Sequence, residues 1–403
     1  MRTRNGLFQF CLFLSILCVF ILPTKAMAAV EIYGDFSVNL NLDQENKEFI
    51  GDPPEGDLGA YLSGNLYLSV VNEENHQYLL DLEIIGSMDE IDGEPPLGIN
   101  VNQLFLQIPL ANYNYLYCGR KIKEIGVSKV FNVSNRISPR YLAGYKYKRN
   151  VTPGFIELNS IVTPNRAHGF IVYFRETKNW DELNLATYID YHQGNFSGDG
   201  YFYFEKLNDP YLGLNLSYQW GFYQFYLESI WKGKTEKTLL AGETGDLSND
   251  FLTVERKNML SMVAGVSISH DDWDFVLEYL RWQEGYNEAE QRQFIDYVKA
   301  CKTDFTYEPY AFTKNYLVIS WSLDSFFHPD LSFEVTGVTS FQSLSKRLSS
   351  FTSWELSTNL RYMLSQNLGI AFHLKCPTGG KYGEFNNLTA TGPSLALILT
   401  HLF

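Results

Sequence analysis

Apolar and polar residues alternate along almost the whole chain, in segments of about ten residues that follow one another from Val30 to the end. In the first segment, VEIYGDFSVNLNL, Ile32 and Phe36 fall on one face of an extended chain, and Glu31 and Asp35 fall on the other. This period of two predicts β-strands with one apolar face and one polar face. Ten residues are enough for a tilted strand to cross a bilayer.

Eighteen such segments can be counted, and the connections between them alternate in length. The short connections are NEEN at 72, AN at 111, TPNRA at 163, QGNFSGD at 193, QWG at 219, SHDD at 269, LDSFFHP at 323 and LSQN at 364. The long connections are 43–57, 89–98, 121–152, 232–256, 285–311 and 377–391.

This alternation predicts an all-β fold, a single up-and-down antiparallel transmembrane β-barrel with short periplasmic turns and long outer loops. The connections at 176–182 and 206–210 are shorter than the pattern requires, so sixteen strands stay open as an alternative. A secreted all-β sandwich is a second alternative, because half-buried sheets also alternate. The length of the chain without a domain break and its two classes of connection favour the barrel.

The start of the chain predicts export. Two arginines precede a long apolar run, and the small-residue sequence AMA ends at Ala28. This arrangement is typical of a secretory signal peptide over 1–28, which leaves one barrel domain over 29–403. A retained membrane helix is the alternative, but no stop-transfer pattern follows the run.

Charge and composition exclude several functions. Removal of the signal peptide takes away three bases and changes the formal charge from −14 to −17, so nucleic acid is not an expected partner. Cys118, Cys301 and Cys376 remain, and their spacing fits neither a disulfide framework nor a zinc site. The seven histidines are scattered and no nucleophile motif is present, so neither a cofactor nor enzyme activity is expected.

Two short stretches carry a resemblance to a known family. VEIYGDFSV at the start of the mature chain is similar to the first strand of porins, and the last strand places Leu395, Leu397, Leu399 and Phe403 on one face. The chain thus resembles Gram-negative outer-membrane β-barrels of the porin type, although His401 stands where an aromatic or aliphatic residue is commoner. The resemblance implies a location in the bacterial outer membrane. It also implies that these four residues close the barrel and form the signal read by the barrel-assembly machinery.

With the apolar face toward lipid, the opposite face of each strand must line the interior. That face carries acids and bases, namely Asp81, Glu83, Glu157, Asp190, Glu228, Asp274, Glu278, Glu355, Arg120, Arg175, Arg361 and Lys375. Isolated ions would cost several kcal/mol each to desolvate, so their presence predicts a water-filled channel. A plugged lumen, or one in which these ions pair with each other, is the alternative.

The most distinctive stretch is residues 119–149, which holds nine bases and one acid, a net charge of +8. If this connection folds into the lumen, its bases would attract anions. The candidate anion-attracting residues are Arg120, Lys121, Lys123, Arg136, Arg140, Lys146, Lys148 and Arg149, together with Arg175 on a neighbouring strand. The alternative is an outer loop whose bases bind lipopolysaccharide phosphates.

One long connection carries a helical pattern instead of a strand pattern. In EAEQRQFIDYVKACK, Phe294, Tyr297, Val298 and Cys301 recur at helical spacing. We therefore expect a short amphipathic helix that packs on the mouth of the barrel.

These observations together predict a porin-like channel for the passive diffusion of small polar or anionic solutes. An adhesin or structural barrel that acts through its outer loops is the alternative function, and an outer-membrane enzyme is a weaker one. The expected partners are outer-membrane lipid and lipopolysaccharide, the barrel-assembly machinery and small solutes. The sequence leaves open whether the chain forms a homo-oligomer.

Deletion of Phe403 should reduce the amount of folded protein in the outer membrane and leave export intact, because the last strand must pair with the first to close the barrel. Surface labelling of cells and fractionation of the periplasm measure the two quantities. Normal surface levels of the shortened chain would contradict this role of Phe403.

Overall fold

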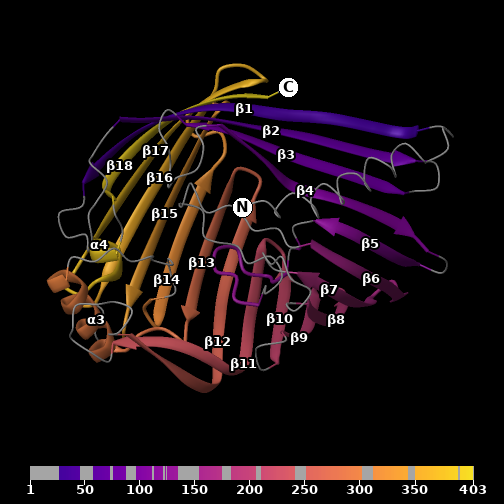
Figure 1. The fold of residues 1–403 in the computed structure, drawn as a ribbon. Helices are drawn as coiled ribbons and strands as arrows, with labels where there is room; N and C mark the ends of the chain where they lie inside the picture. Colours follow the sequence, from indigo (N-terminus) through magenta and orange to yellow (C-terminus); the bar gives the residue numbers. More distant parts are fainter. Residues whose placement is uncertain are drawn as a thin grey trace.

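In the computed structural model, the chain forms a closed barrel of eighteen antiparallel strands around a central space (Figure 1). The structure describes residues 27–45, 58–72, 76–87, 97–110, 113–120, 123, 125–134, 154–174, 183–205, 210–240, 251–301, 312–343, 350–388 and 391–402. Each strand pairs with its neighbours in sequence, and β1 also pairs with β18. The prediction of an eighteen-stranded barrel is confirmed, and the sixteen-strand alternative is excluded.

The strands of the first half are β1 (Met27–Glu45), β2 (Leu58–Asn72), β3 (Gln77–Ser87), β4 (Leu97–Pro109), β5 (Asn114–Arg120), β6 (Gly154–Thr163), β7 (Arg166–Phe174), β8 (Leu183–Gln193) and β9 (Phe196–Phe204). Those of the second half are β10 (Tyr211–Trp220), β11 (Tyr223–Leu240), β12 (Phe251–His270), β13 (Trp273–Arg281), β14 (Asn315–Leu323), β15 (Leu331–Phe341), β16 (Ser353–Met363), β17 (Leu368–Gly379) and β18 (Thr391–Leu402). Two helices are described, α3 (Glu288–Cys301) and α4 (Glu384–Leu388).

The seam between β1 and β18 closes the sheet, and the C-terminal end lies beside β1 in Figure 1. The register places three leucines of β18 opposite three residues of β1: Leu395 opposite Leu42, Leu397 opposite Leu40 and Leu399 opposite Val38. Closure leaves no strand edge, so every strand finds a partner within the sheet. Phe403 and residues 1–26 lie outside the described residues, so the assembly signal and the signal peptide stay predictions.

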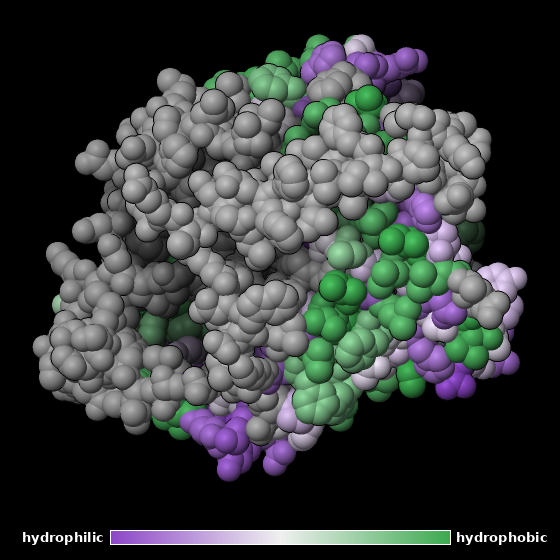
Figure 2. Space-filling model, turned by 45° about the vertical axis from the view of Figure 1, so that its right-hand side comes forward, coloured by the Kyte–Doolittle hydropathy of each residue, from purple (hydrophilic) through white to green (hydrophobic). Residues whose placement is uncertain are grey.

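The outward face of the wall is apolar. Ile32 and Phe36 are exposed, and so are Trp220, Phe222 and Tyr223 around the turn between β10 and β11. Figure 2 shows hydrophobic side chains gathered on the wall at the right of the view and hydrophilic ones at its lower edge. An apolar band with aromatic residues near a turn is the surface that a barrel presents to a bilayer. The fold is therefore that of a membrane-spanning barrel. Among the described residues, neither helix is long and apolar enough to cross a membrane.

The predicted loop at 232–256 is wrong in part. The ladder between β11 and β12 continues outward from the pair Lys232 and Met259 as far as the pair Leu240 and Phe251. Polar alternation is compatible with a water-exposed hairpin, and the cross-strand ion pair between Lys234 Nζ and Glu255 Oε2 spans 2.9 Å. The loop is therefore a long hairpin that projects beyond the barrel.

Helix α3 confirms the predicted amphipathic helix. Asn287 caps its start, because Asn287 Oδ1 accepts the N–H groups of Ala289 and Glu290 at 3.0 Å each. Glu290 Oε2 in turn accepts the N–H of Asn287 at 2.9 Å, which completes a capping box. The apolar face of α3 packs with side chains of the neighbouring outer connections: Phe294, Ile295, Tyr297, Phe312, Phe351, Tyr382 and Leu388 form one buried cluster.

The projecting hairpin is fastened to α3 by Glu290, and Figure 1 shows the outer ends of β11 and β12 curving toward this helix. Glu290 Oε2 lies 3.0 Å from Lys237 Nζ, and Oε1 lies 2.5 Å from a terminal nitrogen of Arg256. Burial raises the pKa of Glu290, but the Asn287 N–H and the two bases outweigh it and hold the pKa below its ordinary value. The fastening is therefore present at neutral pH and is lost only as the pH falls through this lowered pKa.

Replacement of Glu290 with Gln should release the hairpin at neutral pH, because Lys237 and Arg256 lose their only described acidic partner in α3. Trypsin should then cleave after these two bases several-fold faster in the folded protein. Glu255→Gln is the matched control, since the ion pair of Glu255 with Lys234 is exposed and contributes little. Equal cleavage rates in the two variants would contradict the fastening role.

Candidate channel constriction

The connection after β5 enters the barrel. Gly119 lies near the end of β5 with a φ of 134°, and an added Cβ would lie 2.3 Å from the carbonyl oxygen of Leu104, so only glycine fits there. Lys123 and residues 125–134, here called the lumen segment, then lie against the inner faces of several strands from β7 to β15. In Figure 1 this segment crosses the interior in front of β10–β13.

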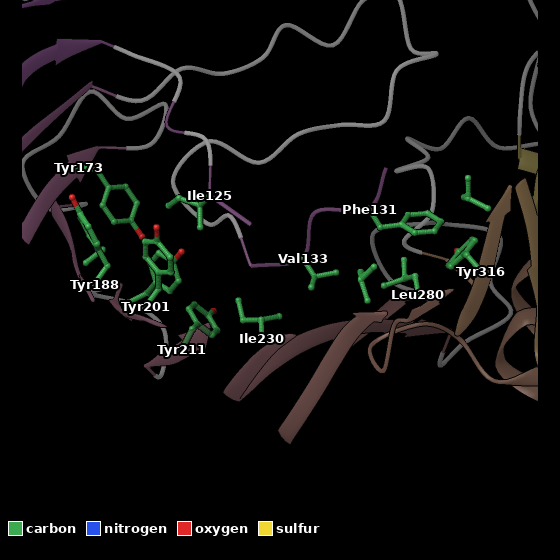
Figure 3. Packing of buried hydrophobic residues seen from close by; sticks show 14 of the residues in the cluster. Ile125, Phe131, Val133, Tyr173, Tyr188, Tyr201, Tyr211, Ile230, Leu280 and Tyr316 are labelled. Carbon is green, nitrogen blue, oxygen red and sulfur yellow. The ribbon is translucent and has the colours of Figure 1, made fainter. Parts of the chain in front are cut away.

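The apolar side chains of the lumen segment are buried in the inner wall. Figure 3 shows Ile125 beside a group of tyrosines, Val133 toward Ile230, and Phe131 toward Leu280 and Tyr316. The wall residues of this cluster are Ile171, Tyr173, Ala186, Tyr188, Tyr201, Tyr203, Tyr211, Ile230, Val263, Leu280, Tyr316, Val318 and Val338. Burial of each large apolar side chain contributes roughly 1.5–3 kcal/mol, so this side of the segment is held firmly.

Glu228 on β11 holds both ends of a backbone bend in the lumen segment. Its Oε2 accepts the N–H groups of Val127 and Ser128 at 3.1 and 3.2 Å, and the Ser128 hydroxyl at 2.7 Å. Its Oε1 accepts the N–H groups of Val133 and Ser134 at 2.6 and 2.8 Å. The carboxylate is fully buried, so these donors take the place of water.

Glu278 on β13 holds the middle of the same bend. It accepts the N–H groups of Lys129, of Val130 at 3.0 Å and of Phe131 at 2.9 Å, and it is also fully buried. Every residue from Val127 to Ser134 except Asn132 thus donates its N–H to one of these two carboxylates. The backbone N–H groups of the segment therefore find their hydrogen-bond acceptors on the barrel wall and not in a regular element of the segment itself.

Gly126 permits this close approach. It takes a φ of 105°, and an added Cβ would lie 2.4 Å from Glu228 Oε2. A larger residue would therefore push the carboxylate away from its donors.

Four of the predicted interior acids, Glu157, Glu228, Glu278 and Glu355, are buried, and water is not the partner of all of them. Glu157 pairs with Lys123 at 2.6 Å, and Glu355 pairs with Lys375 at 3.0 Å. Glu228 and Glu278 are enclosed by backbone donors, as described above. The expectation that isolated interior acids mark water is therefore wrong for these two residues, because polar backbone groups solvate a carboxylate equally well.

Few of the predicted anion-attracting residues can be placed. Arg120 is the last residue of β5, opposite Gly154, and Lys123 lies in the lumen beside Glu157. Lys121, Arg136, Arg140, Lys146, Lys148, Arg149 and Arg175 lie outside the described residues.

Sequence reasoning placed Glu228 and Glu278 inside the barrel but missed their anchoring role. A signal was available, because each is the sixth residue of its strand, and the two strands are separated only by β12. Two acids at equal depth and two strands apart can reach the same inserted segment. Among the described residues, no group of three His, Cys, Asp or Glu side chains could hold a metal ion.

Several solved structures share this architecture at low sequence identity. OccK9 (OpdG) of Pseudomonas aeruginosa matches with a TM-score of 0.60 and 9% identity, over 94% of this chain and 99% of that chain. The outer membrane protein opdK of the same species matches with a TM-score of 0.57 and 10% identity, over 93% and 98%. OccAB4 of Acinetobacter baumannii matches with a TM-score of 0.54 and 9% identity, over 94% and 100%.

The chain has the fold of the Occ outer-membrane proteins. The likeness covers nearly the full length of both chains in each comparison. The fold of an outer-membrane porin is therefore confirmed, as the first and last strands predict. No protein-family model matches the sequence, and the search of curated proteins found no similar sequence.

Replacement of Glu228 with Gln should release part of the lumen segment, because an amide nitrogen cannot accept the N–H bonds that the carboxylate accepts. Each donor left unsatisfied costs on the order of 1–3 kcal/mol, so amide hydrogen exchange at 127–134 should rise at least tenfold. Gly126→Ala should act in the same direction. Gly200→Ala is the control, since an added Cβ there meets nothing within 4 Å. Unchanged exchange in Glu228→Gln would contradict the anchoring role.

Proposed function

We propose that this protein is an outer-membrane channel for the passive diffusion of small polar or anionic solutes. The observation that carries the proposal is the lumen segment, which the wall holds across the interior through Glu228 and Glu278. Barrels of sixteen to eighteen strands enclose an aqueous lumen, and an inserted segment narrows it to the size of small solutes. Glu228 and Glu278 hold the segment that narrows the lumen. An adhesin that acts through its outer loops would not need such a segment.

The charge of the interior supports anions as the preferred ions. Backbone N–H groups compensate Glu228 and Glu278, and lysines compensate Glu157 and Glu355, so four interior acids contribute little negative potential.

Arg136 closely follows the lumen segment in the sequence, which supports it as one of the anion-attracting bases. The carbonyl of Ser134 accepts the Tyr203 hydroxyl at 2.8 Å, which fixes the end of the lumen segment on the inner wall. Arg136 follows two residues later, and two extended residues span at most about 7 Å. The proposal therefore assigns Arg136 to the constriction, where an Arg side chain would attract anions.

Asp190 and Asp199 would act against a preference for anions. They are direct cross-strand partners on β8 and β9. If these acids dominated the pore, the channel would prefer cations, so the sign of the selectivity decides between the two groups.

The test is the reversal potential of the refolded protein in a planar bilayer under a gradient of dilute salt. Wild-type protein should prefer anions, and the triple variant Arg136→Gln, Arg140→Gln, Lys146→Gln should shift the potential toward cations. The shift should shrink near 1 M salt, where the Debye length is about 3 Å. Lys234→Gln, on the projecting hairpin, is the control and should have no effect.

A wild-type protein that does not conduct would contradict the channel itself. A conducting protein with an unchanged reversal potential in the triple variant would contradict only the anion preference.

A further inference from the structure

Two tyrosines donate to the carboxylates that hold the lumen segment. The Tyr226 hydroxyl of β11 donates to Glu278 Oε1 of β13 at 2.7 Å, and the Tyr188 hydroxyl of β8 donates to Glu157 Oε1 of β6 at 2.5 Å. In each case one strand lies between donor and acceptor. The same arrangement therefore occurs twice, on separate parts of the wall.

A glycine of the intervening strand makes each arrangement possible. Gly265 of β12 is paired with Tyr226 on one side and with Glu278 on the other. An added Cβ at Gly265 would lie 2.5 Å from two ring carbons of Tyr226. The ring thus lies across the glycine, and its hydroxyl reaches Glu278 on the next strand.

The second arrangement repeats this geometry. Gly169 of β7 is paired with Tyr188, and an added Cβ would lie 1.9 Å from Tyr188 Cε1. Asn159, the partner of Gly169 on β6, donates its Nδ2 to the Tyr188 hydroxyl at 2.8 Å, and the hydroxyl donates to Glu157. This hydroxyl therefore accepts one hydrogen bond and donates another.

The two carboxylates hold different parts of the chain that enters the lumen. Glu278 accepts the N–H groups of Lys129 to Phe131, and Glu157 pairs with Lys123, whose Nζ lies 5.0 Å from the ring centre of Tyr188. Both tyrosines and both glutamates are buried. A glutamate has three rotatable side-chain bonds, so a fixed hydroxyl limits where its carboxylate can lie.

We propose that Tyr226 and Tyr188 are positioning residues of the constriction, and that Gly265 and Gly169 are glycines because the two rings must lie across them. The proposal rests on the proposed function, since it concerns what sets the width and steadiness of the pore. The tyrosines act through Glu278 and Glu157 and do not themselves touch the solute. If the rings only filled the wall, removal of the hydroxyl oxygen alone would have no effect on the segment.

Tyr226→Phe keeps the ring and removes the bond to Glu278. Loss of a hydrogen bond to a charged group should increase the undocked population of the lumen segment about tenfold or more. Amide exchange at 129–131 should rise by that factor, and the single-channel conductance should be larger and noisier. Gel mobility of the unheated, folded barrel should stay unchanged, because the strand ladders do not involve the hydroxyl. Tyr188→Phe should loosen the contact of Lys123 in the same way.

Gly265→Ala provides a second, independent test of the proposal. It should reproduce the effect of Tyr226→Phe, because the added Cβ displaces the ring and carries the hydroxyl away from Glu278. In a Tyr226→Ala background the same substitution should have no further effect, since the ring is absent and the two changes are not additive. Gly200→Ala is again the control.

Wild-type exchange at 129–131 in Tyr226→Phe would overturn the proposal, even in a protein that conducts. Additive effects of Gly265→Ala and Tyr226→Ala would also overturn it, because the glycine would then act apart from the ring. Amide exchange can be measured in a protein that does not conduct. A wild-type protein that failed to conduct would contradict the proposed function, and the exchange rates would still test the positioning role of the tyrosines.

Discussion

The interior of this barrel depends on two buried glutamates that accept backbone N–H groups. Glu228 and Glu278 lie on strands of the wall, and their donors lie on a segment that belongs to no sheet. A segment of irregular backbone inside a barrel must satisfy its own polar groups, and here the wall supplies the acceptors. Without these carboxylates, the apolar side chains of the segment would still favour the wall, but the N–H groups that donate to Glu228 and Glu278 would lose these acceptors.

The same solution recurs at the outer end of the barrel. The hairpin formed by β11 and β12 is fastened through Lys237 and Arg256 to one carboxylate, that of Glu290. In both places carboxylates join a projecting or inserted segment to a regular element, two at the lumen segment and one at the hairpin. One carboxylate can accept several bonds, so it orders more backbone than a neutral side chain of equal size.

Not all of the charge inside the barrel faces a solute. Some acids are structural, because backbone groups or lysines compensate them, and they add little to the potential in the pore. The bases between Arg120 and Arg149 have one acid among them, and the proposed function gives these bases the main influence on the solute. A net charge of the whole protein is thus a poor guide to the field that a solute meets.

The sequence by itself determined the barrel. Alternation at period two sets which face of each strand meets lipid, and short turns set the order of the strands, so both follow from local pattern. The helix at 288–301 was also readable, because its apolar spacing and its Asn-x-x-Glu cap are local signals. The hairpin at 232–256 was misread as a loop, since polar strands outside the membrane lack the apolar face that marks the others. Only the tertiary structure decided what the interior acids do. Glu228 and Glu278 are about a hundred or more residues from the N–H groups they accept, and a carboxylate that faces water has the same sequence signature as one that faces backbone.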